Sequence, residues 1–338
     1  MSTLRVIAEV GVNHNGSLDM AKKIIDLACI SGVDVVKFQT AVPDLVQTPN
    51  APKAQYQRLT DKDSESALEM VKSIHLPITD YRELKNYVEA RGVSFMSTAF
   101  DLTSLEALHD LDEHTFKVPS GEINNLRYLE RISQIAGEVI LSTGMSTLEE
   151  VSKCLEILTS DTLTRDNVVI LQCNTAYPTP PSDVNLRAMT MMGNYFGTRY
   201  GLSDHTVGVE ASIAAVALGA CVIEKHITLD KTLPGPDHSA SLEVSKLPDF
   251  VAMLRNVKEM MGNPRKEPSS SEVQNKANVR RGVYAAKDVK PGTRLRYEDL
   301  VCLRPENGID PMSINHFIGK HIRTAKKKFD SIMWTDID

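Results

Sequence analysis

Short apolar runs recur along the chain, and each is followed by a longer stretch with apolar residues at helical spacing. The runs are rich in Val, Ile and Phe, which is typical of buried strands. The pattern predicts eight strands, at residues 5–11, 33–40, 93–100, 115–121, 138–144, 168–174, 198–204 and 221–229.

Amphipathic segments between the runs predict helices, for example at residues 18–32, 79–92, 147–158 and 208–220. Ser146, followed three residues later by Glu149, predicts a capping box at the start of the third of these helices. Eight strand–helix units in roughly 240 residues match a closed parallel (β/α)8 barrel. A doubly wound open sheet is the alternative, but no GxGxxG or Walker sequence follows any predicted strand. The barrel is therefore the preferred prediction.

The rest of the chain predicts a second, smaller domain. We assign residues 1–262 to the barrel, including a longer connection at 41–78 with one helix and proline-rich coil, expected to form a lid or an oligomer contact. Residues 263–278 are polar and rich in Pro and Ser, so we expect a linker. Residues 279–338 contain short strand-like runs and turn sequences such as KPGT, and they predict a small, mostly β domain.

Charge and cysteine usage narrow the classes of partner. A net charge of −6 gives no electrostatic reason to expect binding to nucleic acid or to an anionic membrane. The five cysteines are scattered and lack CxxC spacing, which favours a reducing compartment over a zinc–thiolate site. The chain shows no signal peptide and no apolar run of membrane-spanning length. We therefore expect a cytoplasmic protein.

Polar residues end every predicted strand, and two of them are lysines inside otherwise apolar runs. In a parallel barrel the strand C-termini meet at one face, where active sites are built. Lys37 and Lys117 would each place an ammonium where desolvation is costly unless an anion compensates it. One interpretation is a structural pair with a buried Glu9 or Glu122. The other is a pocket for a phosphate and a carboxylate, in which the lysines are joined by the hydroxyls of Thr98, Ser120, Ser142 and Ser203.

Two histidines follow neighbouring strands, His205 in GLSDHT and His226 in VIEKHIT. Neutral imidazoles bind Mn, Fe, Co, Zn and similar divalent ions, so the pair predicts a metal site with open positions for water and substrate. Either histidine alone would be explained by a hydrogen-bonded structural imidazole. Downstream, Asp237 lies in the loop LPGPDHSAS, where its carboxylate can orient substrate hydroxyls or simply occupy a turn.

Specific motifs cover nearly the whole chain: AEVGVNHNGS, VKFQT, STAFD, FKVPSGE, LSTGMS, YPTP, GLSDHT, EKHITLD and GPDHSAS. As a set they resemble the sialic acid synthase family, and RRGVYAAKDVKPGTRL resembles that family's C-terminal antifreeze-like (SAF) domain. The resemblance implies a (β/α)8 barrel joined to a SAF domain in a domain-swapped homodimer. It also implies condensation of phosphoenolpyruvate with an N-acetylated sugar aldehyde, releasing phosphate and a nine-carbon 2-keto acid.

The resemblance also implies site residues. A divalent metal, Mn²⁺ with Mg²⁺ or Co²⁺ as substitutes, would be held by His205 and His226. Phosphoenolpyruvate would contact Lys37, Thr98, Lys117, Ser120, Ser142 and Ser203, with either Asn174 or Thr175 facing the phosphate. The sugar would contact Gln39, Tyr177 and Asp237, and the carboxylates near the reacting atoms would be Glu9 and Glu122. The sugar's acetamido group would meet an arginine from the small domain of a second copy, Arg281 or alternatively Arg280.

The segment CNTAYPTP, residues 173–180, differs from the CTNIYPTP of many N-acetylneuraminate-type members. With the DVNLRAM that follows, it is more similar to legionaminic acid synthases. This similarity implies a 2,4-diacetamido-2,4,6-trideoxyhexose as substrate, with N-acetylmannosamine as the alternative. Two other hypotheses are a Schiff-base aldolase that uses Lys117 or Lys37, and a non-catalytic carbohydrate-binding protein.

Overall fold

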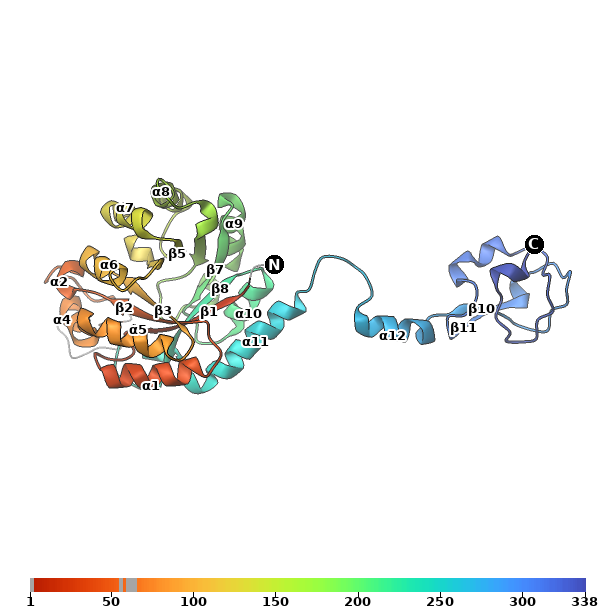
Figure 1. The fold of residues 1–338 in the computed structure, drawn as a ribbon, viewed down its shortest axis with the longest axis horizontal. Coiled ribbons are helices and arrows are strands. Elements are labelled where there is room, and N and C mark those ends of the chain that lie inside the picture. The colour runs from red at the N-terminus through yellow and green to blue at the C-terminus, as the bar shows by residue number, and fades with distance from the viewer. Residues whose placement is uncertain (1–2, 55–56, 59–65) are drawn as a thin grey trace. The chain divides into compact units, whose positions relative to one another are not determined.

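The computed structural model describes residues 3–54, 57–58 and 66–338, and the chain divides into two compact units, Met1–Gly262 and Asn263–Asp338. Strands and helices alternate through the larger unit (Figure 1). Its strands are β1 (Arg5–Gly11), β2 (Val35–Thr40), β3 (Ser94–Ala99), β4 (Thr115–Val118), β5 (Glu138–Ser142), β6 (Val168–Gln172), β7 (Arg199–Asp204), β8 (Val222–Thr228) and the short β9 (Leu242–Glu243). Its helices are α1 (Leu18–Cys29), α2 (Pro43–Val46), α4 (Ala67–Ile74), α5 (Tyr81–Glu89), α6 (Leu102–His109), α7 (Leu126–Ile135), α8 (Leu148–Leu158), α9 (Leu186–Phe196), α10 (Glu210–Ala217) and α11 (Leu247–Met260).

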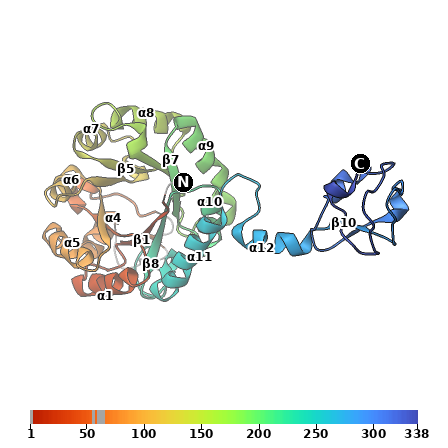
Figure 2. The same cartoon turned by 45° about the vertical axis from the view of Figure 1, so that its right-hand side comes forward.

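The eight long strands form a parallel sheet in the order β3-β2-β1-β8-β7-β6-β5-β4. The two end strands, β3 and β4, lie next to each other, so the sheet forms a nearly closed barrel. Helices surround the strands (Figure 2). This arrangement confirms the predicted (β/α)8 barrel and excludes the open doubly wound sheet.

The inward-facing side chains change from apolar to polar along the strands. Near the strand N-termini the barrel interior is filled by an apolar cluster that includes Ile7, Val35 and Val222. Successive side chains of a strand point to opposite faces, so residues two positions later face inward again. Two residues after these three lie Glu9, Lys37 and Glu224, all buried. The alternation therefore places ionisable groups inside the barrel, directly above an apolar floor.

Side-chain caps at the helix N-termini set where several helices begin. The hydroxyl of Ser17 accepts a hydrogen bond from the Met20 amide at the start of α1. At α8 the capping box is formed by Thr147 and Glu150, not by Ser146 and Glu149 as predicted. The Thr147 backbone is extended, as an N-cap requires, so the helix begins one residue later than the Ser146 pattern indicated.

Among its described residues, the connection at 41–78 contains the helices α2 and α4, where the sequence predicted one helix. These two helices contact each other (Figure 1). Pro43 stands in the first turn of α2, where a missing backbone N–H costs nothing. Residues 55–56 and 59–65 of this connection lie outside the described residues.

The smaller unit has its own apolar core, formed by residues such as Val283, Leu295, Phe317 and Ile332. Its regular elements are α12 (Ser270–Val279) and an antiparallel pair, β10 (Gly282–Ala285) and β11 (Leu300–Leu303). The segment predicted as a linker is thus partly helical. A capping box between Ser269 and Glu272 starts α12, whose residues are all exposed.

The structure contains no helix, in the ranges it describes, that is long and apolar enough to cross a membrane. The five cysteines are all unpaired, and Cys154, Cys173 and Cys221 are buried. This unpaired state agrees with the scattered spacing seen in the sequence.

Candidate active site

Four buried charged side chains, from β1, β2, β4 and β8, form an ionic cluster inside the barrel. We call Glu9, Lys37, Lys117 and Glu224 the ionic cluster. Lys37 Nζ lies 2.8 Å from Glu9 Oε2 and 3.6 Å from Glu224 Oε2. Lys117 Nζ lies 3.7 Å from Glu224 Oε1. Glu224 therefore joins the two lysines, which come from β2 and β4, strands separated by β3.

Burial and pairing set the charges of the cluster. Burial alone would lower the pKa of Lys37, but the carboxylates of Glu224 and Glu9 outweigh it and raise that pKa. Burial lowers the pKa of Lys117, for which Glu224 is the only ion-pair partner among the described residues. Burial also raises the pKa of Glu9, whereas the two lysines hold the pKa of Glu224 below its usual range. Lys37 and Glu224 are therefore the two residues of the ionic cluster that remain charged at neutral pH.

Hydroxyl groups surround the two ammonium groups. Lys37 Nζ donates to Thr98 Oγ1 at 2.9 Å, and Lys117 Nζ donates to Ser142 Oγ at 2.8 Å. Ser203 Oγ donates to Glu224 Oε1 at 3.0 Å. The predicted residues Thr98, Ser142 and Ser203 are therefore brought together with the lysines, as a phosphate- and carboxylate-binding pocket requires.

Ser120 and Thr175 approach each other at Gly144, in the loop that follows β5. A Cβ atom added to Gly144 would lie 3.1 Å from Ser120 Oγ and 3.0 Å from Thr175 Cγ2. It would also lie 3.0 Å from the sulfur of Cys173, whose Sγ accepts a hydrogen bond from the Gly144 amide. Gly144 therefore allows these side chains to come close to its backbone.

His205 and His226 lie side by side, with ring centroids 5.4 Å apart. The ring of Tyr177 stacks on His205 at 4.1 Å and meets His226 edge-on at 5.6 Å. Burial lowers the pKa of His205 to about 4 and moves the pKa of His226 well below its usual value. Both imidazoles are therefore neutral at neutral pH, the form that binds metal ions.

A backbone carbonyl orients His205. Its Nδ1 donates to the Asn174 carbonyl oxygen at 2.6 Å, so the lone pair is on Nε2, which lies 3.1 Å from the Tyr177 hydroxyl and 3.3 Å from Ser203 Oγ. The Asn174 side chain is engaged in its own loop, because its Oδ1 accepts from the Ala176 amide at 2.7 Å. Asn174 and Thr175 were the two residues that could face the phosphate, and of these Thr175 has its side chain near Ser120.

Gln39 and Asp237 lie at the edge of the same site. Gln39 Nε2 donates to Glu9 Oε1 at 3.1 Å, and Asp237 Oδ2 lies 3.9 Å from Nδ1 of His226. Burial raises the pKa of Asp237 to about 7. Gly11 has φ +56°, and a Cβ there would lie within 3.3 Å of Gln39, Glu9 and His226. This close approach, together with the left-handed backbone, requires glycine.

Glu122 was predicted to be in the site but lies outside this group, and Arg280 and Arg281 belong to the smaller unit. Glu122 is half-buried after β4, and its Oε2 accepts from Asn125 Nδ2 at 2.6 Å rather than pairing with either lysine. Arg280 directly follows α12, and Arg281 Nη1 donates to the Cys302 carbonyl at 2.8 Å within the smaller unit. Of the two carboxylates that the sequence suggested as partners of the lysines, Glu9 pairs with Lys37, and the other paired carboxylate is Glu224 rather than Glu122.

Glu224 is the site residue that sequence reasoning missed. It stands in the run VIEKHIT, where strand alternation separates Glu224 and His226 from Lys225. Lys225 faces outward and pairs with Asp204 at 3.0 Å. Glu224 lies two positions before His226, which the sequence assigned to the barrel mouth, so both side chains face the barrel interior. This period of two was the signal that could have identified Glu224 from the sequence.

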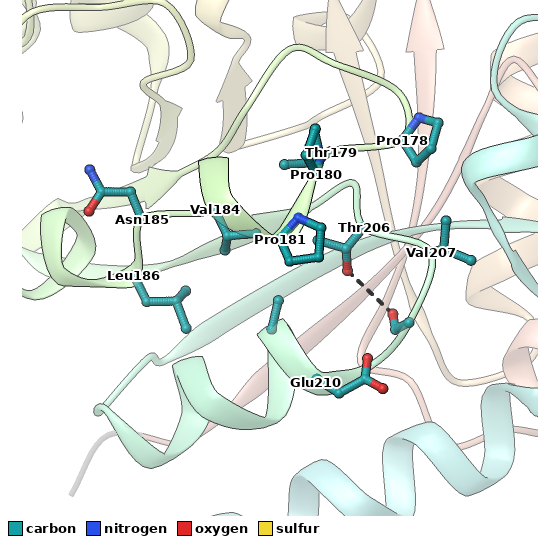
Figure 3. Close-up of a pocket in the computed structure, with 12 residues that line it drawn as sticks. Pro178, Thr179, Pro180, Pro181, Val184, Asn185, Leu186, Thr206, Val207 and Glu210 are labelled. Atoms are coloured by element: carbon teal, nitrogen blue, oxygen red, sulfur yellow. Dashed lines mark hydrogen bonds between the residues drawn. The ribbon is translucent and has the colours of Figure 1, made fainter.

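A cavity of about 700 Å³ is lined by residues such as Pro178, Val184 and Thr206 (Figure 3), and its described lining includes neither histidine and no residue of the ionic cluster. It is formed by the loops after β6 and β7, and Thr206 donates to the Gly208 carbonyl at 3.5 Å along its edge. Of the described residues that line it, Glu210 alone is charged. Size alone therefore does not identify the reactive site.

Comparisons with known proteins agree with these features. The NeuB family model matches residues 24–266, and the SAF domain model matches residues 280–338. The N,N'-diacetyllegionaminic acid synthases of Campylobacter jejuni and Legionella pneumophila are 43% and 38% identical, covering 98% and 99% of this chain and 99% and 95% of their own. The solved N-acetylneuraminic acid (sialic acid) synthetase of Leptospira borgpetersenii, in complex with citrate, is 28% identical with a TM-score of 0.70, covering 81% of this chain and 90% of its own. The chain therefore belongs to the NeuB family and carries a C-terminal SAF domain, as the sequence motifs implied.

Proposed function

We propose that this protein condenses phosphoenolpyruvate with a 2,4-diacetamido-2,4,6-trideoxyhexose and water to give a legionaminic-type nonulosonic acid and phosphate. The observation that carries the proposal is the convergence of two buried lysines and two neutral histidines inside one barrel mouth. The names of the two bacterial relatives support the diacetamido sugar over N-acetylmannosamine. The wider class, a phosphoenolpyruvate-dependent nonulosonic acid synthase, rests on the family as a whole.

In this proposal the two lysines bind phosphoenolpyruvate. Lys37 and Lys117 are buried, so their attraction to a phosphate and a carboxylate is not screened by water. Thr98 and Ser142 already bond the two ammonium groups and can donate to the anionic oxygens beside them. Ser120 and Thr175, which meet at Gly144, are the hydroxyls assigned to the phosphate.

Synthases of this family are generally metal-dependent, and the histidine pair fits a divalent ion. The lone pair of His205 Nε2 faces the site, and His226 Nδ1 is buried without a hydrogen-bond partner. No group of three or more His, Cys, Asp or Glu ligands occurs among the described residues, so two ligands leave an open site. We infer Mn²⁺, with Mg²⁺ or Co²⁺ as substitutes; when bound, it would polarise the aldehyde carbonyl as a Lewis acid.

The carboxylates provide the proton transfers. Carbon 3 of phosphoenolpyruvate forms a bond to the aldehyde carbon, whose oxygen takes up a proton and becomes a hydroxyl group. Water adds to carbon 2 and loses one proton. The C–O bond to phosphate then breaks to leave the 2-keto group, and the second proton of the water leaves with the phosphate. Glu9 has a raised pKa and can exchange a proton with that water at its carboxyl oxygens, while Glu122 remains the alternative. Lys37 and Lys117 stabilise the charge on the departing phosphate.

Phosphate release from phosphoenolpyruvate, measured with a panel of acetamido sugars, tests the proposal. We expect release with the diacetamido sugar and less with N-acetylmannosamine. If no sugar of the panel supports phosphate release, the result would favour a non-catalytic carbohydrate-binding protein. The lowered pKa of the buried Lys117 favours a Schiff-base aldolase as the second candidate. That enzyme would be trapped by borohydride in the presence of the sugar and phosphoenolpyruvate, whereas we expect no trapping.

We further propose that the protein works as a domain-swapped homodimer, in which Arg281 of a second copy approaches the sugar's acetamido group. Support comes from the exposed position of Arg281, whose guanidinium keeps donors beyond the single bond to the Cys302 carbonyl. The five unpaired cysteines favour the cytoplasm as the compartment.

A further inference from the structure

A buried ion pair lies on the outer side of the strands, between β7, β8 and α10. Lys225 Nζ is 3.0 Å from Asp204 Oδ2, and the two side chains are 1% and 0% exposed. The hydroxyl of Ser212, on α10, donates to the same carboxylate oxygen at 2.6 Å. Helix α10 contacts both strands, so it covers the pair from outside. The proposed reaction uses none of these three side chains.

Burial makes such a pair a poor source of stability. Each charge loses its hydration when the chain folds, and the attraction between the two charges only roughly offsets that loss. Apolar side chains of similar volume would fill the same space without this cost. A buried charge pair does fix geometry, because each charged group must keep its hydrogen-bond partners in place. The partners of Lys225 and Asp204 therefore show what the pair holds.

These partners lie on both sides of His205. Asp204 directly precedes this histidine, and Thr206 directly follows it. The amide and the hydroxyl of Thr206 donate to Asp204 Oδ1 at 2.9 and 2.7 Å. Lys225 Nζ donates to the carbonyl oxygen of Thr206 at 2.9 Å. The backbone on either side of His205 is thus anchored to the ion pair, which fixes the segment from which the imidazole extends.

The same pair holds the strand that carries His226. Lys225 stands between Glu224 and His226 in β8. It lies opposite Asp204 in the register of β7 with β8. Because side chains alternate between the two faces of a strand, an outward Lys225 requires His226 to point into the barrel. One ion pair therefore ties together the two strand ends that carry the histidines, whose rings lie 5.4 Å apart.

We propose that Lys225 and Asp204 are positioning residues of the metal site, which hold the histidine pair at the separation that a divalent ion requires. The inference rests on the metal role in the proposed function and adds the groups that set the geometry of the two ligands. Groups that orient metal ligands without touching the metal typically contribute about 10- to 100-fold to its affinity. The lysines assigned to phosphoenolpyruvate come from β2 and β4, so its binding without metal should not depend on the pair.

The test measures Mn²⁺ binding to the chelator-treated, full-length protein from the electron paramagnetic resonance signal of free Mn²⁺. Calorimetry of phosphoenolpyruvate without metal is the second readout. Lys225→Met should weaken Mn²⁺ binding by about 10- to 100-fold and leave phosphoenolpyruvate binding unchanged. Lys85→Met is the matched control, because Lys85 of α5 pairs with Glu113 in the same barrel and this helix packs on β3. The control should bind Mn²⁺ as the unsubstituted protein does. Equal weakening in both variants would indicate a general loss of structure and overturn the inference.

The double variant Lys225→Met with Asp204→Asn separates positioning from stability. It leaves neither charge of the pair buried alone, and the asparagine oxygen can still accept from Thr206, so its urea midpoint should exceed that of Lys225→Met. The link between the two strands is still missing, so Mn²⁺ binding should stay weak. Unweakened Mn²⁺ binding in either variant overturns the inference. If the unsubstituted protein binds Mn²⁺ no better than His205→Ala with His226→Ala, the metal role in the proposed function fails, and the inference fails with it.

Discussion

Replacing Glu224 with glutamine tests whether the ionic cluster depends on the carboxylate that joins its lysines. Glutamine keeps the size of the side chain and can still accept from the Ser203 hydroxyl. Lys37 would retain Glu9, 2.8 Å away. Lys117 would retain no carboxylate within ion-pair distance among the described residues. The substitution therefore leaves one buried ammonium unpaired.

Two routes give the same magnitude for the loss of stability. Removing one partner of a buried ion pair costs about 3–5 kcal/mol, and the side chain of Lys117 is only 4% exposed. Alternatively, Lys117 loses its proton. Deprotonating a lysine with an ordinary pKa near 10.4 at pH 7 costs about 4.6 kcal/mol. We therefore expect Glu224→Gln to lower the free energy of unfolding by about 3–5 kcal/mol.

The assay is urea unfolding with a chelator present, followed by far-ultraviolet circular dichroism. The single tryptophan, Trp334, lies in the smaller unit, so its fluorescence would not report on the barrel. Glu106→Gln is the control, because Glu106 pairs with Arg131 at 2.6 Å on the surface. Exposed pairs of this kind contribute about 0–1 kcal/mol.

Phosphoenolpyruvate provides a second readout on the same variant. Its anionic groups would sit beside Lys117 and replace part of the missing charge, so the difference in stability should narrow when it is added. If Glu224→Gln loses no more stability than Glu106→Gln, the cluster does not depend on Glu224 and the reasoning fails.

Three further predictions concern the metal, the second copy and acid stability. Chelation should abolish turnover until Mn²⁺ is added. The double variant His205→Ala with His226→Ala should be inactive, and adding Mn²⁺ should not restore its turnover. Full activity in a chelated enzyme would contradict the metal role. Arg281→Ala should lower kcat/KM for the sugar by about 10- to 100-fold and leave KM for phosphoenolpyruvate unchanged, whereas equal losses would count against a contact with the sugar. Burial would raise the pKa of Glu138, but two arginines hold it below its usual range. Its ion pairs therefore add stability above about pH 4.3, and this stability is lost as the pH falls through the folded pKa. Glu138→Gln should flatten the acid side of a plot of the urea unfolding midpoint against pH. An acid side that is unchanged in the variant would refute this prediction.

The strands and the two lysines could be predicted because their signals are local. Each strand is a short apolar run, and the predicted run at 5–11 coincides with β1 (Arg5–Gly11). Lys37 and Lys117 stood out as cations inside such runs, where burial needs a compensating anion. The histidine pair followed from the topology, since β7 and β8 are neighbours in the barrel.

The remaining features depend on contacts that a linear pattern does not contain. Glu224 stands among three consecutive polar residues, and only the strand period separates the inward carboxylate from the outward Lys225. Helix α12, in the predicted linker, has no buried residue, so the sequence contains no apolar stripe that would predict it. The hydrogen bond from the Ala176 amide to the Asn174 side chain, our reason for proposing Thr175 at the phosphate, exists only in the folded chain.

The most direct test of the condensation is an isotope measurement. Phosphoenolpyruvate labelled with ¹⁸O at the oxygen that bridges carbon 2 and phosphorus is incubated with the protein and the diacetamido sugar. Because we propose that water adds to carbon 2 and the C–O bond breaks, the label should appear in the released phosphate. Label retained in the keto acid would mean that the P–O bond breaks instead, and it would contradict the role assigned to this barrel mouth.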